Sequence, residues 1–255
     1  MKTPIDMPQT LRELDRRFAE NDLAGAGEYL DAALSLARKT GDTAAVLSLR
    51  SEQVGYFRKT GEKEKALEAI DEALRLCDML QLRSTVTGAT VLLNCATTYK
   101  AFGQSARALP LYREAEALYA ALLPKNDYRM AGLYNNFALA LCDLAQYPQA
   151  LALYEKALAV LQALGENECD LGVTYVNMAH LFEKMQQEQN LEAALSHAYD
   201  ALMRVNPARR DGYFAFCCDK CAPSFQYFGW FLQGNRLARC AEEGYARQKE
   251  KNKNA

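Results

Sequence analysis

The stretch that decides the fold is residues 133–158, LYNNFALALCDLAQYPQALALYEKAL. Two sets of residues recur in it at the i, i+3, i+4 and i+7 spacings of one helix face, on either side of a short break at 145–148. The first set is Tyr134, Phe137, Ala138 and Leu141, and the second is Ala150, Tyr154 and Ala157. Small side chains at Ala138 and Ala150 allow two helices to pack closely. The stretch therefore predicts a helix–turn–helix hairpin.

The same pattern returns along the chain at a nearly constant period. The small residues of the second helix are Ala66, Ala108, Ala150 and Ala194, which are 42, 42 and 44 residues apart. Those of the first helix are Val54, Ala96, Ala138 and Ala179, which are 42, 42 and 41 residues apart. This period predicts four repeats, at 44–80, 86–122, 128–164 and 170–205. The turn at 186–190 is longer than its counterparts in the other repeats and is expected to be a surface loop.

These hairpins resemble tetratricopeptide repeats (TPRs), whose usual length is ~34 residues. The longer period, together with the segment LYNNFA at 133–138, is similar to the repeats of kinesin light chain, an intracellular cargo-binding protein. The resemblance covers residues 44–205 and, more faintly, 8–38. It implies an all-α fold, a right-handed α-solenoid of antiparallel helix hairpins that binds a protein or peptide partner in its concave groove.

The two ends of the chain depart from the repeat. We expect residues 1–7 to form a loose leader and 8–38 a degenerate N-terminal hairpin. Residues 209–248 are rich in aromatic side chains and predict capping helices, because terminal repeats must cover an exposed apolar end. Within them, Pro223 is expected to kink or end a helix, with 223–248 forming the final hairpin. The polar, lysine-rich residues 249–255 predict a disordered tail.

Composition limits the function classes. Half of the 255 residues are hydrophobic, so the chain can bury a sizeable core, and the formal net charge of −2 argues against a general nucleic-acid binder. No apolar run approaches the ~20 residues of a membrane span or resembles a signal peptide. We therefore expect a cytoplasmic protein that binds neither membrane nor nucleic acid. Its eight cysteines are expected to be reduced thiols.

The main candidate site is a row of asparagines in the first helices of neighbouring repeats. Asn94, Asn136 and Asn177 are 42 and 41 residues apart, and each lies two residues before the small residue of its helix. An amide offers both a donor and an acceptor, which match the N–H and C=O groups of an extended peptide. The resemblance to kinesin light chain and to carboxylate-clamp TPR domains implies that asparagines here, with Asn135 beside them, contact peptide backbone. The alternative is that they bond neighbouring helices.

Charged residues near the ends of the first helices are candidates for ligand specificity. They are Arg58, Lys59, Lys100, Glu183 and Lys184, with His180 one turn beyond Asn177. The cations favour a hypothesis of an acidic or C-terminal-carboxylate ligand, although cations at helix ends also complement the helix dipole. The full set of two asparagines and three basic residues of a carboxylate clamp does not fit into one group of three repeats.

Two patterns raise the question of chemistry at a site. Cys217, Cys218 and Cys221 form CCDKC, but tetrahedral zinc needs four ligands and a second pair is missing, so packing is the favoured role. Cys142 and His180 fall on neighbouring first helices, where they could meet as a Cys–His nucleophile pair, but the sequence shows no orienting group or oxyanion site for one. We predict no catalytic residue, no metal and no cofactor.

Three functions follow from this pattern. The leading prediction is a non-enzymatic scaffold for protein–protein interaction. The first alternative is a peptide-responsive regulatory sensor acting through a protein partner, because bacterial peptide-pheromone receptors have a similar helical-repeat half. The second is a hydrolase-type enzyme on a helical scaffold. The aromatic C-terminal hairpin is expected to be a capping core or, alternatively, a homodimer interface.

Overall fold

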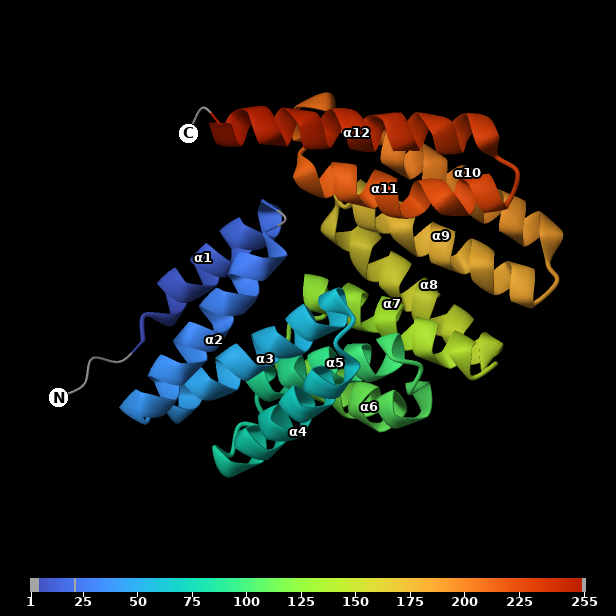
Figure 1. Ribbon diagram of the computed structural model, residues 1–255. Helices are drawn as coiled ribbons and strands as arrows, with labels where there is room; N and C mark the ends of the chain where they lie inside the picture. The colour runs from blue at the N-terminus through green and yellow to red at the C-terminus, as the bar shows by residue number, and fades with distance from the viewer. Residues whose placement is uncertain (1–4, 21, 254–255) are drawn as a thin grey trace. The chain divides into compact units, whose positions relative to one another are not determined.

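The computed structural model describes residues 5–20 and 22–253, which form twelve α-helices, one short 3₁₀ helix and no strand (Figure 1). Successive helices pack together as hairpins. The prediction of an all-α fold built from helix hairpins is thus confirmed for these residues. The chain divides into two compact units, unit 1 (Met1–Pro124) and unit 2 (Lys125–Ala255).

Unit 1 contains three helix pairs. Their bounds are α1 (Met7–Ala19), α2 (Leu23–Thr40), α3 (Thr43–Thr60), α4 (Lys63–Met79), α5 (Val86–Ala101) and α6 (Ser105–Leu122). The turn between α2 and α3 shows how the local sequence sets these bounds. Gly41 ends α2 with φ 77°, a left-handed conformation that favours glycine, and the side chain of Asp42 then accepts the backbone N–H of Ala45 to start α3.

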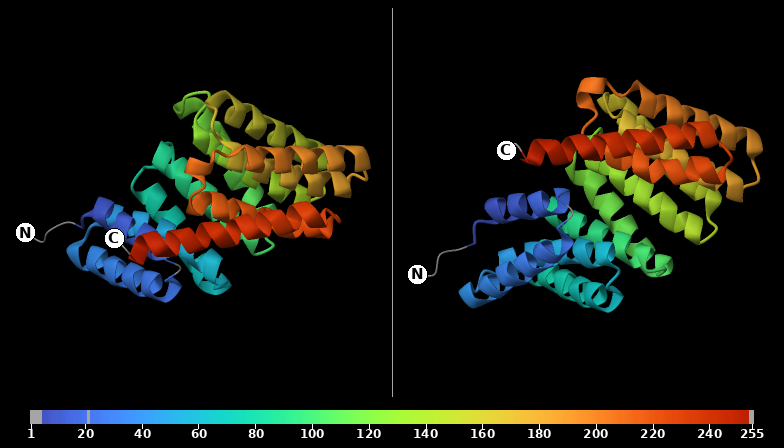
Figure 2. Two further views of the ribbon diagram at one scale, coloured as in Figure 1. Left: turned by 90° about the horizontal axis from the view of Figure 1, so that it is seen from above. Right: turned by 45° about the horizontal axis from the view of Figure 1, so that its top comes forward.

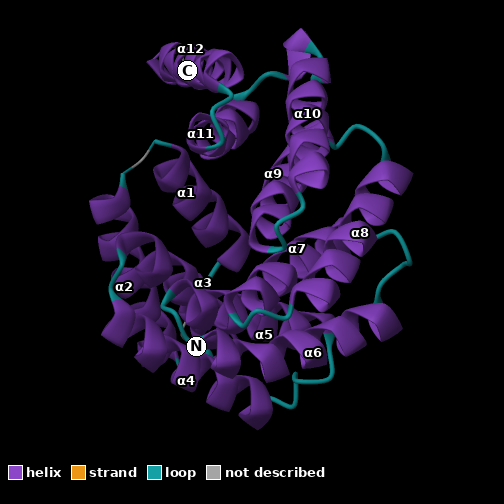
Figure 3. Ribbon diagram, turned by 90° about the vertical axis from the view of Figure 1, so that its right-hand side faces the viewer, coloured by secondary structure: helices purple, strands orange, loops and turns teal. Residues whose placement is uncertain are grey.

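Unit 2 contains three further pairs. Their bounds are α7 (Tyr128–Asp143), α8 (Tyr147–Leu164), α9 (Glu168–Lys184), α10 (Glu188–Arg204), the 3₁₀ helix η1 (Pro207–Arg209), α11 (Gly212–Tyr227) and α12 (Phe231–Lys253). The first helix of each pair contacts the next, since α9 packs against both α7 and α11. Figure 2 shows α12 beside α11 in both views, and Figure 3 shows helices and loops but no strand among the described residues.

The residues that define the repeat form the core of each hairpin. Ala138 on α7 and Ala150 on α8 are fully buried, and so is the large ring of Tyr154. Small residues let the two helix backbones approach each other, and the tyrosine fills the space beside them. The same holds for Ala96 and Ala108 in unit 1.

The C-terminal end differs from our expectation in two ways. Helix α11 continues through Pro223, so the final hairpin is α11 with α12 and not residues 223–248. The proline lies on the exposed side, while residues before and after it, Cys218 and Phe225, are fully buried, and this continuous buried face holds the helix together. Helix α12 runs to Lys253, so the prediction of a disordered tail from 249 is wrong for 249–253. Residues 250–253, EKNK, contain no glycine or proline to stop it. Residues 254–255 lie outside the described residues.

Two smaller differences concern helix ends. Helix α1 begins at Met7, the last residue of the expected leader, with Asp6 as its N-cap. The loop expected at 186–190 is absent, because the turn between α9 and α10 is 185–187, as short as the turn at 144–146. The additional residues instead lengthen α10, which begins six residues before Ala194, whereas α8 begins three before Ala150.

Candidate functional site

A small cavity in unit 2 brings three of the predicted site residues together. Its volume is about 140 Å³, and Asn135, Asn136 and Asn177 all line it. Asn135 and Asn136 come from α7 and Asn177 from α9, while the third wall comes from α11. The first helices of three consecutive pairs therefore meet at one site.

Asn135 bonds a neighbouring helix, which was the alternative to contact with a peptide. Its amide nitrogen donates to the hydroxyl of Thr174 on α9 (2.9 Å) and to the carbonyl of Ala131 (3.3 Å). Thr174 is fully buried and donates in turn to the carbonyl of Asp170 (2.7 Å). The amide oxygen of Asn135 is buried and receives no hydrogen bond from the described residues.

Asn136 and Asn177 keep more of their hydrogen-bonding capacity. The amide nitrogen of Asn136 donates to the carbonyl of Gly132 one turn earlier (2.9 Å). Among the described residues, Asn177 makes no hydrogen bond through its side chain. Both side chains are half-buried. Both a donor and acceptors are thus available to a ligand at this point of the cavity.

A second group of cavity residues, missed from the sequence, bonds the starts of α7, α9 and α11 together. The hydroxyls of Tyr128 (2.9 Å) and Tyr213 (2.6 Å) both donate to Oδ1 of Asp170. Partial burial raises the pKa of Tyr128 to about 12 and also raises the pKa of Tyr213, so both hydroxyls remain protonated donors. The signal was present in the spacing, because Asp170 follows Tyr128 by 42 residues and precedes Tyr213 by 43.

His180 and Glu183 connect α9 to α11 away from this cavity. Nε2 of His180 lies 2.8 Å from the hydroxyl of Ser224, and Glu183 accepts the hydroxyl of Tyr227 (2.7 Å). Burial lowers the pKa of His180, so its ring is neutral at pH 7. Lys184 follows as an exposed residue.

The remaining predicted residues lie in unit 1. Asn94 on α5 donates to the hydroxyl of Ser51 on α3 (3.0 Å), which again links neighbouring first helices. Arg58 is half-buried, and burial lowers its pKa. Lys59 is exposed, with its ammonium 5.4 Å from the ring centroid of Phe18, while Lys100 is half-buried.

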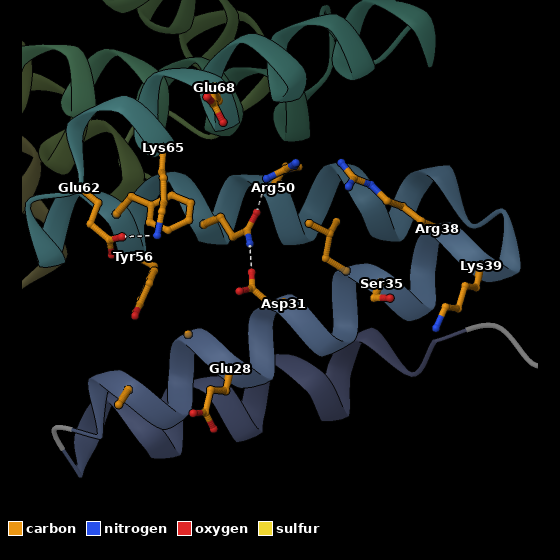
Figure 4. A pocket seen from close by; sticks show the side chains of 15 residues that line it. Glu28, Asp31, Ser35, Arg38, Lys39, Arg50, Tyr56, Glu62, Lys65 and Glu68 are labelled. Carbon is orange, nitrogen blue, oxygen red and sulfur yellow. Dashed lines mark hydrogen bonds and ion pairs between the residues drawn. The ribbon is translucent and has the colours of Figure 1, made fainter.

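A larger cleft in unit 1 contains none of the predicted site residues. It measures about 740 Å³ and lies between α2 and the α3–α4 hairpin (Figure 4). Its polar side chains bond to one another. Gln53 donates to Asp31 (2.8 Å) and accepts from Arg50 (2.6 Å), and Lys65 pairs with Glu62 (2.6 Å). Ligand pockets are mostly apolar with a few convergent polar groups, which this cleft does not match.

Comparison with solved structures identifies the architecture. BtubC (BKLC) from P. vanneervenii is 25% identical, with a TM-score of 0.69 over 79% of this chain and 81% of that one. A putative kinesin light chain of Podosopora anserina with nearly identical TPR-like repeats gives 16% identity and a TM-score of 0.58, over 79% of this chain and 95% of that one. This chain has the TPR-like repeat fold. These matches confirm the resemblance of this TPR-like chain to kinesin light chain.

A Rap protein complexed with Competence and Sporulation Factor has the same fold. It is 15% identical with a TM-score of 0.65, and the match covers 93% of the TPR-like chain and 62% of the Rap chain. No family model matches the sequence, and no curated protein matches it significantly. No helix among the described residues is long and apolar enough to cross a membrane.

The cysteines of the CCDKC segment and of the Cys142–His180 pair lie among packed side chains in this TPR-like structure. Cys217, Cys218 and Cys221 are buried free thiols, and burial raises the pKa of Cys221 to about 12. The described residues contain no group of three or more His, Cys, Asp or Glu side chains suited to a metal ion. Cys142 lies beside the buried Tyr154, whereas His180 bonds to Ser224 on α11, so these contacts give no nucleophile pair.

Proposed function

We propose that this TPR-like chain is a non-enzymatic interaction scaffold that binds an extended peptide segment of a partner along α7, α9 and α11. The fold supports the general role, because stacked helical repeats present long binding surfaces. The observation that carries the finer proposal is the unit 2 cavity, where Asn136 and Asn177 line one site with hydrogen-bonding groups still available.

The size of the cavity supports a peptide over a small molecule. Small-molecule sites are ~300–1,000 Å³, whereas this cavity is about 140 Å³, which suits one side chain of a longer ligand. The neighbouring amides of Asn136 and Asn177 then bind the peptide backbone beside it, since an amide complements N–H and C=O groups together.

A regulatory sensor is the alternative that a specific observation favours. A Rap protein with this fold is solved in complex with Competence and Sporulation Factor, so a protein of this architecture holds a ligand. A sensor differs from a plain scaffold in that its ligand changes the binding of a second protein. Peptide-dependent gain or loss of a protein partner would favour the sensor. Hydrolysis that is lost in Cys142→Ala would instead favour an enzyme.

The test selects peptides from a randomised display library on the immobilised full chain and measures their affinity by fluorescence anisotropy. We expect the double variant Asn136→Ala/Asn177→Ala to bind the selected peptides at least ~10-fold more weakly, because each lost hydrogen bond to a peptide is worth about 0.5–1.5 kcal/mol. The affinity of Asn94→Ala for the same peptides tests separately whether the row of asparagines extends to α5: weaker binding would include Asn94 in the site.

The matched control is Asn190→Ala, at an exposed asparagine on α10 whose side chain donates to Gln187, three residues earlier (2.8 Å). It should bind as the unchanged chain does. If the double variant keeps its circular dichroism spectrum and its peptide affinity, the proposed site is wrong. If no peptide is enriched above the background of the support, the proposal of peptide binding fails as a whole.

We further propose that the C-terminal hairpin joins two copies of the chain. Tyr227, Phe231 and Leu232, which surround the turn between α11 and α12, are 67%, 60% and 84% exposed. Exposed apolar clusters mark interaction surfaces. We expect a dimer by light scattering after size-exclusion chromatography, and a monomer for Phe231→Glu/Leu232→Glu. A monomer for the unchanged chain at micromolar concentration would contradict this proposal.

A further inference from the structure

We propose that the unit 2 cavity selects peptides carrying an arginine side chain, whose guanidinium binds Asp170 and stacks on the rings of Tyr213 and Phe216. This inference rests on the proposed peptide-binding function and names the chemistry that the site recognises. It runs against the earlier hypothesis of an acidic ligand.

The first argument is the hydrogen-bonding state of Asp170. Oδ1 of this carboxylate already accepts two hydroxyl donors, from Tyr128 and Tyr213, and these hold the group in one orientation. Oδ2 accepts no hydrogen bond from the described residues. The hydroxyls of Tyr128 and Tyr213 both donate to Oδ1, so Oδ2 is the acceptor that this part of the cavity offers to a ligand.

The second argument is the charge distribution around the cavity. Asp170 is the single acid and Lys220 the single base among the described residues that line it. Lys220 lies seven residues after Tyr213 on α11, which places the two Cα atoms roughly 10 Å apart along the helix. The backbone of Lys220 therefore lies about two helix turns along α11 from that of Tyr213, whose hydroxyl binds Asp170. Arg209 of η1, which lies outside the cavity lining, already forms an ion pair with Glu166, just before α9 (3.3 Å).

The third argument is the pair of exposed rings beside the carboxylate. Tyr213 and Phe216 stack with centroids 6.3 Å apart and 23° between their planes. They are 47% and 51% exposed, whereas Phe214 and Phe225 on the same helix are fully buried. A guanidinium is planar, stacks on aromatic faces and donates several hydrogen bonds, so a carboxylate next to exposed rings suits arginine better than the compact, strongly hydrated ammonium of lysine.

The test uses degenerate synthetic peptide pools that differ in one fixed central residue: arginine, its neutral analogue citrulline, lysine or glutamate. Retention of each pool on the immobilised full chain is measured. We expect the arginine pool to be retained at least ~10-fold more strongly than the citrulline pool, because citrulline has nearly the same shape but lacks the positive charge that strengthens hydrogen bonds to a carboxylate. Lysine should fall between them.

Two variants separate this inference from a merely structural role of the residues. Asp170→Asn keeps an oxygen for the tyrosine hydroxyls and should remove the preference for arginine over citrulline. Phe216→Ala, at an exposed ring, should weaken retention of the arginine pool without affecting the fold. Asn190→Ala, the exposed control on α10 outside the cavity, should leave the arginine preference intact.

The outcomes distinguish the two proposals. Equal retention of the arginine and citrulline pools overturns the arginine inference while peptide binding stands. Preferential retention of the glutamate pool overturns it in favour of Lys220 as the specificity residue. Retention of no pool above the support alone defeats peptide binding itself, and the arginine inference with it.

Discussion

Replacing Phe225 with alanine is expected to lower the free energy of unfolding by about 3–5 kcal/mol, the usual cost of deleting a fully buried aromatic ring. Phe225 is 0% exposed. Its ring makes edge contacts with Tyr199 (centroids 6.2 Å apart) and Trp230 (6.1 Å), so it joins α10, α11 and the turn before α12. The alanine variant leaves a cavity where these three elements meet.

Urea unfolding followed by circular dichroism measures this effect, and the matched control lies on the same helix. Phe216→Ala removes the same ring from an exposed position of α11 and should change stability by no more than about 0.5 kcal/mol. Similar losses in both variants would contradict the assignment of Phe225 to the core and of Phe216 to the cavity wall. A large loss in Phe225→Ala alone would show that part of the aromatic cluster caps the repeats.

The hairpins of this protein could be predicted because helix packing leaves a periodic trace in sequence. Two helices cross closely only where both side chains are small, so Ala138 and Ala150 recur as Ala96 and Ala108 one period earlier. Such a constraint acts at fixed positions in every repeat. The recurring small residues therefore indicate each helix pair even when nothing is known of the repeats that pack beside it.

The roles of the asparagines could not be predicted in the same way. Asn135 and Asn136 are adjacent, and which one bonds Thr174 depends on the rotation of α7 about its axis against α9. A single residue of helix changes the direction of a side chain by ~100°. Spacing alone has an uncertainty of one residue, as the separations of 42 and 41 show, and that is enough to exchange the two roles.

The continuation of α11 through Pro223 was missed for a different reason. A proline inside a helix removes one hydrogen bond and costs ~3 kcal/mol or more, which favours a break there in an isolated segment. In the folded chain, the buried face of α11 includes Phe214, Cys218 and Phe225, and full burial of one such large side chain contributes ~1.5–3 kcal/mol. Tertiary packing therefore exceeds the local penalty.

Filling the unit 2 cavity is the second substitution with a large expected effect. Gly132 lies within α7 and lines the cavity, and a Cβ atom added there meets no other atom within 4 Å. Gly132→Leu should therefore place a bulky side chain in the cavity. Removing a glycine from a helix also favours folding, by up to ~1 kcal/mol. We expect peptides selected on the unchanged chain to bind Gly132→Leu at least ~10-fold more weakly, a loss of ~1.4 kcal/mol or more.

The structure offers a close control for this substitution. Gly55 lies within α3 of unit 1, and an added Cβ atom there also meets nothing within 4 Å. Gly55→Leu makes the same chemical change in the same type of helix, so it should gain helix stability and keep its peptide affinity. Equal affinity of both leucine variants would place the peptide outside the unit 2 cavity. A loss of peptide affinity in Gly132→Leu alone would locate binding in the unit 2 cavity, because both variants add the same side chain at a glycine inside a helix.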